Sequence, residues 1–205
     1  MDPKEFRKDL FTVPNVLTMT RIATAPAIGY FIVKGQVDWA AGLFTYSCLT
    51  DFVDGWIARR YNQKSVVGSI IDPLADKLLM TVCTVALSIT HQMPALVATA
   101  VIGRDVMLSL MAFYYRYKSL SPPKSLSKFL DIQGNPTITV LPNTLGKVNT
   151  ALQMFYIAGL VLQPVLQPYY DMSTGMDIFG VVVFCTTIAS GCSYVFGKHA
   201  FRYVK

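Results

Sequence analysis

The sequence predicts an all-α integral membrane protein with six transmembrane helices and an N-terminal interfacial amphipathic helix. Of its 205 residues, 53% are hydrophobic and only 15% are charged, against roughly 25% charged residues in an average soluble domain. The apolar residues gather into six stretches, each close to the roughly 20 residues that a spanning helix requires. This composition excludes a disordered chain and argues against a soluble globular protein. We expect residues 1–205 to form a single membrane domain.

The expected elements follow one another along the chain. Asp2 and Pro3 can start a short helix that places Phe6 and Leu10 on one face, which is typical of a helix lying on the membrane surface. Short, turn-like links separate most of the later elements, but the loop at about 118–146 is long and contains four prolines, so we predict no helix there. The expected spanning segments are residues 15–33, 39–58, 70–90, 96–115, 148–165 and 178–196.

Basic residues are distributed unequally between the two ends of these segments. Six spans place both termini on one side, and 14 of the 18 Lys and Arg residues fall on that side, which we call the basic side. Only Lys34 lies on the other side, and Arg21, Lys77 and Arg104 lie within spans. Basic loops stay in the cytoplasm or its mitochondrial equivalent, the matrix. The net charge of +6 favours anionic lipid over nucleic acid as a partner.

Four carboxylates lie inside the second and third spans, where ionisable residues are costly and mark functional sites by default. Asp51 and Asp54 are three residues apart, and Asp72 and Asp76 are four apart, so each pair shares one helix face. Because a short link joins the two spans, all four carboxylates should converge near the basic side. Crowded negative charges require neutralisation, and oxygen ligands favour Mg²⁺ or Mn²⁺ over zinc. We therefore expect a site for divalent ions.

The other potential ligands indicate no separate site. The four cysteines lie in apolar stretches and form no C-x-x-C pair, so neither a zinc site nor a disulfide framework is expected. Neither of the two histidines begins the H-x-K-x4-D motif of phospholipase-D-like transfer. The carboxylates are therefore the candidates for chemistry.

Small residues are interleaved with the carboxylates and leave room for a bulky ligand. The complete pattern is Asp51-x2-Asp54-Gly55-x2-Ala58-Arg59-x8-Gly68-x3-Asp72-x3-Asp76. It resembles the signature of the CDP-alcohol phosphatidyltransferase family at all eight fixed positions. The resemblance implies transfer of a phosphatidyl group from a CDP-lipid to an alcohol, with release of CMP. It further implies dependence on Mg²⁺ or Mn²⁺, with two divalent ions, and suggests a homodimer.

The same resemblance implies roles for individual residues. The expected metal ligands are Asp51, Asp54, Asp72 and Asp76, and Asp76 is also the expected base for the acceptor hydroxyl. The residues expected to bind the CDP-lipid are Gly55, Ala58, Arg59, Gly68, Asn15, Thr18 and Arg21. The candidates for binding the acceptor are Arg104, Lys147 and Asn149. Three alternatives stay open at this point. The residues near the start of the first span could serve helix packing, and Arg59 could simply extend to the basic side. Arg104 and Asp105 could form a structural buried pair with other helices.

Several stretches resemble the eukaryotic branch of the family that makes cardiolipin from CDP-diacylglycerol and phosphatidylglycerol. They are residues 50–52, 74–78, 103–106 and 147–150, together with the long proline-bearing loop. That branch implies the mitochondrial inner membrane, with the site facing the matrix. An alternative within the family is a phosphatidylglycerophosphate synthase, which uses glycerol 3-phosphate as the acceptor. An alternative of another class is a membrane transporter or channel, but a conduction path would distribute charges across the bilayer rather than gather them at one end.

Overall fold

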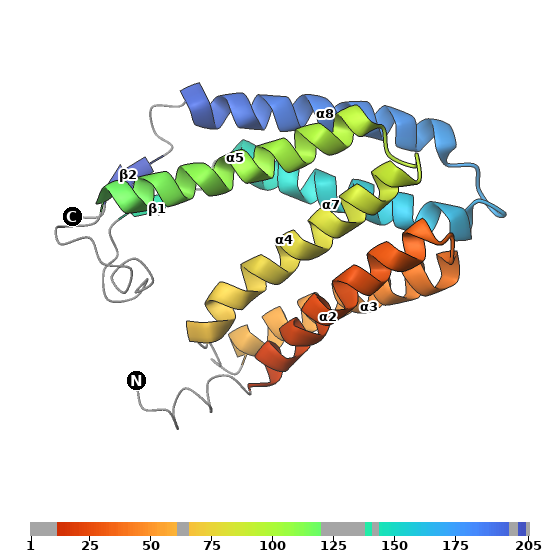
Figure 1. The fold of residues 1–205 in the computed structure, drawn as a ribbon, viewed down its shortest axis with the longest axis horizontal. Coiled ribbons are helices and arrows are strands. Elements are labelled where there is room, and N and C mark those ends of the chain that lie inside the picture. The colour runs from red at the N-terminus through yellow and green to blue at the C-terminus, as the bar shows by residue number, and fades with distance from the viewer. Residues whose placement is uncertain (1–11, 61–65, 120–137, 141–143, 197–200, 204–205) are drawn as a thin grey trace.

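The computed structural model describes residues 12–60, 66–119, 138–140, 144–196 and 201–203 (Figure 1). Within these residues the six predicted apolar stretches coincide with six helices, and the N-terminal surface helix that we predicted lies outside them. The helices are α2 (Val13–Val33), α3 (Val37–Arg60), α4 (Val66–Ile89), α5 (Ala95–Ser119), α7 (Thr144–Leu166) and α8 (Ser173–Phe196). Two short strands, β1 (Ile138–Val140) and β2 (Phe201–Tyr203), complete the described elements.

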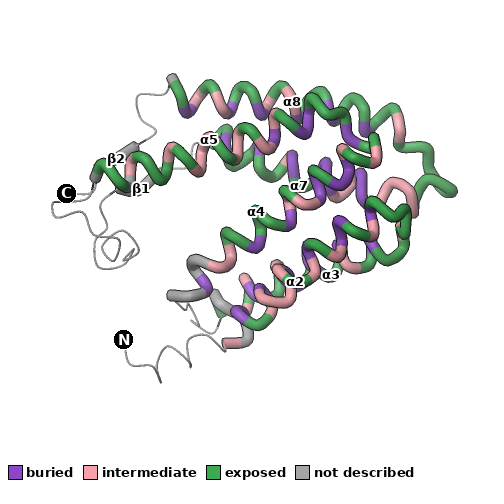
Figure 2. Tube along the Cα trace, in the orientation of Figure 1, coloured by how far each residue is buried: buried purple, intermediate pink, exposed green. Residues whose placement is uncertain are grey.

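Four of the described helices, α2, α5, α7 and α8, are long and apolar enough to cross a membrane. Helices α3 and α4 have 24 residues each, which is also a spanning length, and they carry the four carboxylates. The outer faces of the helices are largely exposed (Figure 2). Large apolar side chains lie on them, among them Trp39, which is 66% exposed, and Phe155, which is 69% exposed. A surface this rich in exposed apolar groups is matched to lipid rather than to water.

The helices alternate in direction, so the start of α2, the end of α3 and the start of α4 lie at one end of the bundle, together with the end of α5, the start of α7 and the end of α8 (Figure 1). This end is the basic side of the sequence analysis. At the opposite end the chain reverses through residues with left-handed backbone, Gly35 with φ of 69° and His91 with φ of 57°. Such residues end helices by returning their amide groups to the last turn, as the Gln92 amide does to the Leu87 carbonyl at 3.0 Å.

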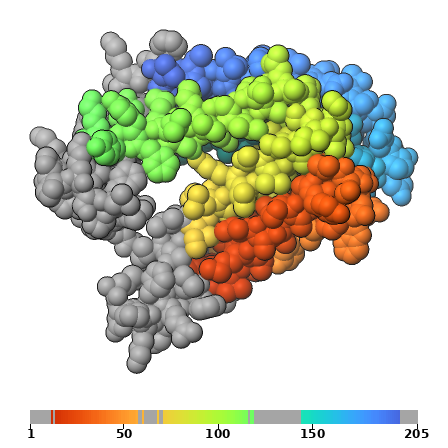
Figure 3. Space-filling view, viewed as in Figure 1, coloured from red at the N-terminus to blue at the C-terminus, as the bar shows by residue number. Residues whose placement is uncertain are grey.

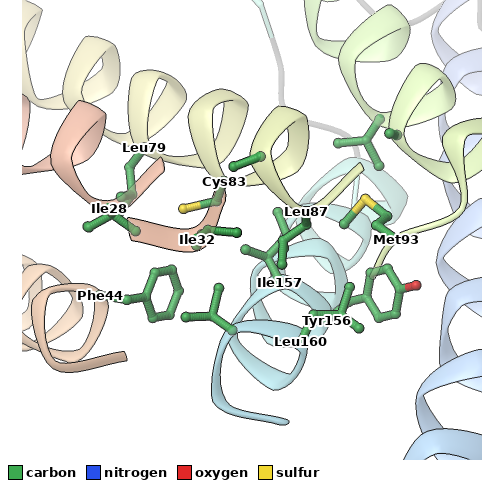
Figure 4. Packing of buried hydrophobic residues seen from close by; sticks show 14 of the residues in the cluster. Ile28, Ile32, Phe44, Leu79, Cys83, Leu87, Met93, Tyr156, Ile157 and Leu160 are labelled. Carbon is green, nitrogen blue, oxygen red and sulfur yellow. The ribbon is translucent and has the colours of Figure 1, made fainter. Parts of the chain in front are cut away.

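The hydrophobic core occupies the half of the bundle away from the basic side. There Ile28 of α2, Leu79 and Leu87 of α4 and Ile157 of α7 are buried against one another (Figure 4). Helices α2 and α4 approach closely at Gly29, where an added Cβ would lie 2.5 Å from a methyl carbon of Val82. Close packing therefore fixes α2, α3, α4 and α7 at this end and leaves the basic end free to hold polar groups.

Helices α4 and α5 diverge from the turn that joins them, because α4 packs mainly along α2 whereas α5 packs mainly along α8. The space-filling view shows the resulting hollow between α4 and α5 toward the basic end (Figure 3). Within the described residues, a hydrogen bond crosses from helix to helix: the Lys77 ammonium of α4 donates to the Ser109 hydroxyl of α5 at 2.7 Å. We call this space the α4–α5 hollow.

The two strands pair antiparallel, with Thr139 opposite Arg202. The sequence analysis predicted an all-α chain and no strand in either segment, so this small sheet is an addition to the prediction. A pair of three-residue strands has no sequence signal of its own, because its pattern is too short to show alternation. The pairing places the segment before α7 beside the segment after α8.

Candidate active site

The buried guanidinium of Arg21 joins three of the four predicted carboxylates. Arg21 of α2 is only 1% exposed. Its Nη1 donates to Asp51 of α3 and, at 2.6 Å, to Asp76 of α4, while its Nη2 donates to Asp54 of α3. Two helices that the sequence placed side by side thus turn their carboxylates toward one cation, and the predicted convergence near the basic side is observed.

The fourth carboxylate has a partner one turn earlier on α2. The Thr18 hydroxyl lies 2.6 Å from Oδ1 of Asp72 and 3.0 Å from the Pro14 carbonyl. Thr18 is fully buried, and Asn15, one turn earlier again, is 2% exposed. Residues three apart on a helix share a face, so α2 presents one polar face to the acidic side chains of α3 and α4.

Sequence reasoning had assigned Thr18 and Arg21 to nucleotide contacts or to helix packing, and it missed that both contact the carboxylates. The sequence did contain a signal for these contacts. Arg21 is one of only three cationic residues that fall within the predicted spans, and a buried cation requires a nearby counter-charge. Four carboxylates at a matching depth supplied that counter-charge.

The remaining residues of the signature lie on the same two helices. Gly55 is half-buried on α3 and Gly68 is buried in the first turn of α4. Ala58 and Arg59 lie in the last turn of α3, and their side chains are outside the described part. The two glycines leave the backbone beside the carboxylates without side-chain cover, as a bulky ligand would require.

The charge and donor chemistry of the cluster fit divalent cations. Arg21 supplies one positive charge against four carboxylates, and carboxylate oxygens are the ligands that Mg²⁺ and Mn²⁺ prefer. Among the described residues, no three acidic, cysteine or histidine side chains form a ready-made metal cage. The reason is geometric, because the carboxylates of Asp51, Asp54 and Asp76 are directed at the guanidinium. A divalent ion would therefore have to share these oxygens with Arg21 or displace it.

Two of the three predicted acceptor residues, Arg104 and Lys147, meet at the first turn of α7. Nη1 of Arg104 donates to Asp105 at 2.7 Å, and Nη2 donates to the carbonyl of Gly146 at 3.4 Å. Lys147 follows Gly146 and is exposed. The pair of Arg104 with Asp105, which the sequence left as an alternative, is thus present.

Asn149, the third acceptor candidate, packs against α8 through its side-chain oxygen, while its amide nitrogen has no hydrogen-bond partner among the described residues. Its side-chain oxygen accepts hydrogen bonds from Thr186 at 2.9 Å and Thr187 at 3.0 Å, both on α8. Gln153 donates to the same Thr187 at 3.0 Å. In the described part of the chain, no hydrogen bond or ion pair joins Asn149 to the carboxylates, so its main structural role is to fix α7 against α8.

Replacing Arg21 with leucine should destabilise the protein when no divalent ion is present. Removing one partner of a buried ion pair costs about 3–5 kcal/mol. Asp51 and Asp76 are 42% and 55% exposed, so water screens part of the loss and we expect about 3 kcal/mol. Thermal unfolding in detergent with a chelator measures this change.

Arg60→Leu is the matched control, because it removes an exposed guanidinium at the end of α3. Adding Mn²⁺ should raise the unfolding temperature of Arg21→Leu more than that of the unaltered protein, because the ion replaces the missing positive charge. Equal unfolding temperatures of Arg21→Leu and the unaltered protein in chelator would contradict this structural role.

Comparison with known sequences agrees with the geometry of the site. Residues 11–191 match the CDP-alcohol phosphatidyltransferase family. The match covers all four carboxylates and both α2 residues that contact them. The chain therefore belongs to the CDP-alcohol phosphatidyltransferase family.

Three relatives refine this assignment. The chain is 38% identical over 200 residues to the cardiolipin synthase (CMP-forming) of Homo sapiens, across 95% of this chain and 64% of that protein. It is 41% identical over 199 residues to a cardiolipin synthase (CMP-forming) / mitochondrial hydrolase fusion protein of Schizosaccharomyces pombe, across 97% of this chain and 33% of that protein. A chloroplastic CDP-diacylglycerol–glycerol-3-phosphate 3-phosphatidyltransferase of Oryza sativa subsp. japonica is 33% identical over 192 residues, which are 92% of this chain and 57% of that protein. The chain thus spans between a third and two thirds of the length of these relatives.

Proposed function

We propose that this chain is a cardiolipin synthase that transfers the phosphatidyl group of CDP-diacylglycerol to phosphatidylglycerol and releases CMP. The proposal rests on one observation: signature carboxylates from α3 and α4 converge on the guanidinium of Arg21 near the basic end. The relatives from human and fission yeast, both named cardiolipin synthases, support this acceptor. The rice relative, whose name specifies glycerol 3-phosphate, is less similar and favours the alternative of a phosphatidylglycerophosphate synthase.

The proposed setting is the mitochondrial inner membrane, with all six helices spanning it, residues 1–205 forming a single domain, and the site facing the matrix. Four helices meet the requirements of length and composition, and α3 and α4 have the length. The distribution of Lys and Arg supports the orientation. A homodimer is proposed by family resemblance. A transporter is disfavoured because the described carboxylates gather at one end of the bundle.

In the proposed mechanism, Asp51, Asp54, Asp72 and Asp76 hold two divalent ions, Mg²⁺ or Mn²⁺. When bound, such ions neutralise the charge of the diphosphate and of the departing CMP. The chain's own residues bind and orient the CDP-lipid. Arg21 already lies among the carboxylates and can exchange one of them for a phosphate oxygen, since a guanidinium suits both. The other proposed CDP-lipid contacts are Asn15, Thr18, Gly55, Ala58, Arg59 and Gly68.

Asp76 is the proposed base. Its carboxylate is half-exposed, so it is accessible to an acceptor. The acceptor hydroxyl oxygen forms a bond to the phosphorus that carries the diacylglycerol, and its proton passes to Asp76. The bond from this phosphorus to the bridging oxygen of the diphosphate breaks, and the electron pair leaves with CMP. Phosphoryl-type transfer depends mainly on such placement and on charge stabilisation.

Arg104, Lys147 and Asn149 are proposed to line the acceptor side of the site. The contact of Arg104 with Gly146 supports a common location for the first two. Asn149 is fixed to α8 through its side-chain oxygen, and its amide nitrogen, which has no partner among the described residues, is the group that would contact the acceptor.

Lipid product analysis tests the proposal. Purified protein is given CDP-diacylglycerol with either phosphatidylglycerol or glycerol 3-phosphate, and the products are separated by mass spectrometry. We expect cardiolipin and CMP with phosphatidylglycerol. Efficient use of glycerol 3-phosphate without formation of cardiolipin would favour the alternative, and no CMP release with either acceptor would contradict both.

A further inference from the structure

Lys77 carries a positive charge that the described residues do not neutralise. It follows the proposed base Asp76 directly on α4, and its side chain is exposed to the α4–α5 hollow rather than packed in the bundle. The hydrogen-bond partner of its ammonium is the neutral hydroxyl of Ser109. In the described part of the chain, Lys77 forms no ion pair. A lone cation within a helix bundle in lipid is costly, so an anionic partner is expected there.

A second cation, Arg104, lies on α5 five residues before Ser109. Ser109 donates to the backbone carbonyl of Asp105 at 2.8 Å, and the Asp105 carboxylate accepts from Arg104. The Arg104 side chain is only 10% exposed, and its Nε has no hydrogen-bond partner among the described residues. Hydrogen bonds therefore link Lys77 through Ser109 to the backbone of Asp105, and the carboxylate of the same residue holds a buried guanidinium whose Nε retains an unused donor.

An apolar groove adjoins Arg104 on its other side. It lies between α5 and α8, has a volume of about 340 Å³, and is lined by Ala100, Gly103, Met107 and Ile188 as well as by Arg104. No side chain projects from Gly103, and an added Cβ there would meet nothing within 4 Å. The groove is open and lies on an apolar surface, so it is matched to a hydrocarbon chain.

We propose that Lys77 and Arg104 together form the binding site for the phosphodiester of the lipid acceptor, with one of its acyl chains lying in the groove between α5 and α8. The proposal rests on the function proposed above and identifies where that acceptor binds. Lys77 and Asp76 leave α4 in different directions, toward α5 and toward α2, so the free glycerol of a headgroup held at Lys77 extends around α4 to reach the base.

The local charge favours a phosphodiester over a phosphomonoester. Lys77, Arg104 and Asp105 sum to one positive charge, and the neighbouring carboxylate of Asp76 is paired with Arg21. This single positive charge matches the single negative charge of phosphatidylglycerol. A phosphomonoester such as glycerol 3-phosphate carries a charge of about −1.5 to −2 at neutral pH. The single positive charge of the site would neutralise only part of it. A soluble acceptor would also make no use of the groove.

Binding of dioleoylphosphatidylglycerol to the detergent-purified protein, titrated by native mass spectrometry, tests the site without requiring turnover. Lys77→Met should weaken binding roughly 10- to 100-fold, as expected for loss of a hydrogen bond to a charged group. Lys77→Arg should restore most of it because the cation is kept. Lys34→Met is the matched control, since it removes an exposed lysine at the opposite end of the bundle, and it should leave binding unchanged.

Gly103→Leu provides an independent test, because it fills the groove without altering a charge. It should weaken binding of the dioleoyl lipid more than that of dihexanoylphosphatidylglycerol, whose chains are short. Unchanged binding of dioleoylphosphatidylglycerol in both Lys77→Met and Gly103→Leu, or displacement of it by glycerol 3-phosphate at equal concentration, would overturn the proposal. Binding that follows the expected pattern in a protein that makes no cardiolipin would instead overturn the proposed function and leave the lipid site standing.

Discussion

Replacing Asp76 with asparagine should lower turnover by roughly 10²- to 10⁴-fold, the usual contribution of a general base. Asparagine keeps the size of the side chain but cannot accept the proton of the acceptor hydroxyl at neutral pH. Asp76 also accepts a hydrogen bond from Arg21 at 2.6 Å, and an amide oxygen can still accept that bond. We therefore expect CDP-diacylglycerol to bind within a few-fold of its normal affinity. Release of CMP in a single turnover measures the chemical step directly.

The control for Asp76→Asn is Asp38→Asn, which removes an exposed carboxylate in the first turn of α3 at the opposite end of the bundle. It should leave turnover unchanged. If Asp76→Asn lost CDP-lipid binding in parallel with turnover, Asp76 would act mainly as a metal ligand, and the role of base would have to pass to another group.

Removal of divalent ions should abolish CMP release, and addition of Mg²⁺ or Mn²⁺ should restore it. The physical reason is the charge balance, since the diphosphate of the substrate adds negative charge to a cluster in which one guanidinium faces four carboxylates. Without divalent cations, the substrate would be repelled.

A readout besides activity is available, because an ion that binds the folded state alone raises the unfolding temperature. Mn²⁺ should stabilise the unaltered protein, and Asp54→Asn should reduce that stabilisation because it removes the most buried of the three carboxylates that contact Arg21. Full activity in excess chelator would rule out the metal assignment, and equal stabilisation of Asp54→Asn would remove Asp54 from the proposed ligands.

Much of the fold follows from local properties of the sequence. Apolar length predicted every described helix, because a helix of about 20 residues is the only way for such a stretch to satisfy its backbone in lipid. The spacing of Asp51 with Asp54, and of Asp72 with Asp76, predicted a shared face within each helix, since that face depends only on helical periodicity. The eight signature positions predicted the family by their identity and spacing.

The partners of these residues were decided by the tertiary structure. Arg21 is separated from Asp51 by 30 residues and from Asp76 by 55, and no local rule specifies which face of α2 meets α3 and α4. That rotation is fixed by the packing of side chains such as Ile28 and Leu79 in the opposite half of the bundle, because closely packed interiors allow few arrangements.

On the acceptor side, too, the sequence determined which residues are present and the tertiary structure decided what they contact. The sequence by itself determined that Lys77 and Arg104 are cations within apolar helices and that Asn149 opens the fifth of the described spans. Only the tertiary structure decided that Asn149 holds α8, that Arg104 reaches the first turn of α7, and that Lys77 crosses to Ser109. The reason is physical. Helical periodicity fixes the direction in which a side chain leaves its own helix, but the residue that it contacts depends on how far α4 and α5 diverge. That divergence is set by the separate packing of α4 on α2 and of α5 on α8.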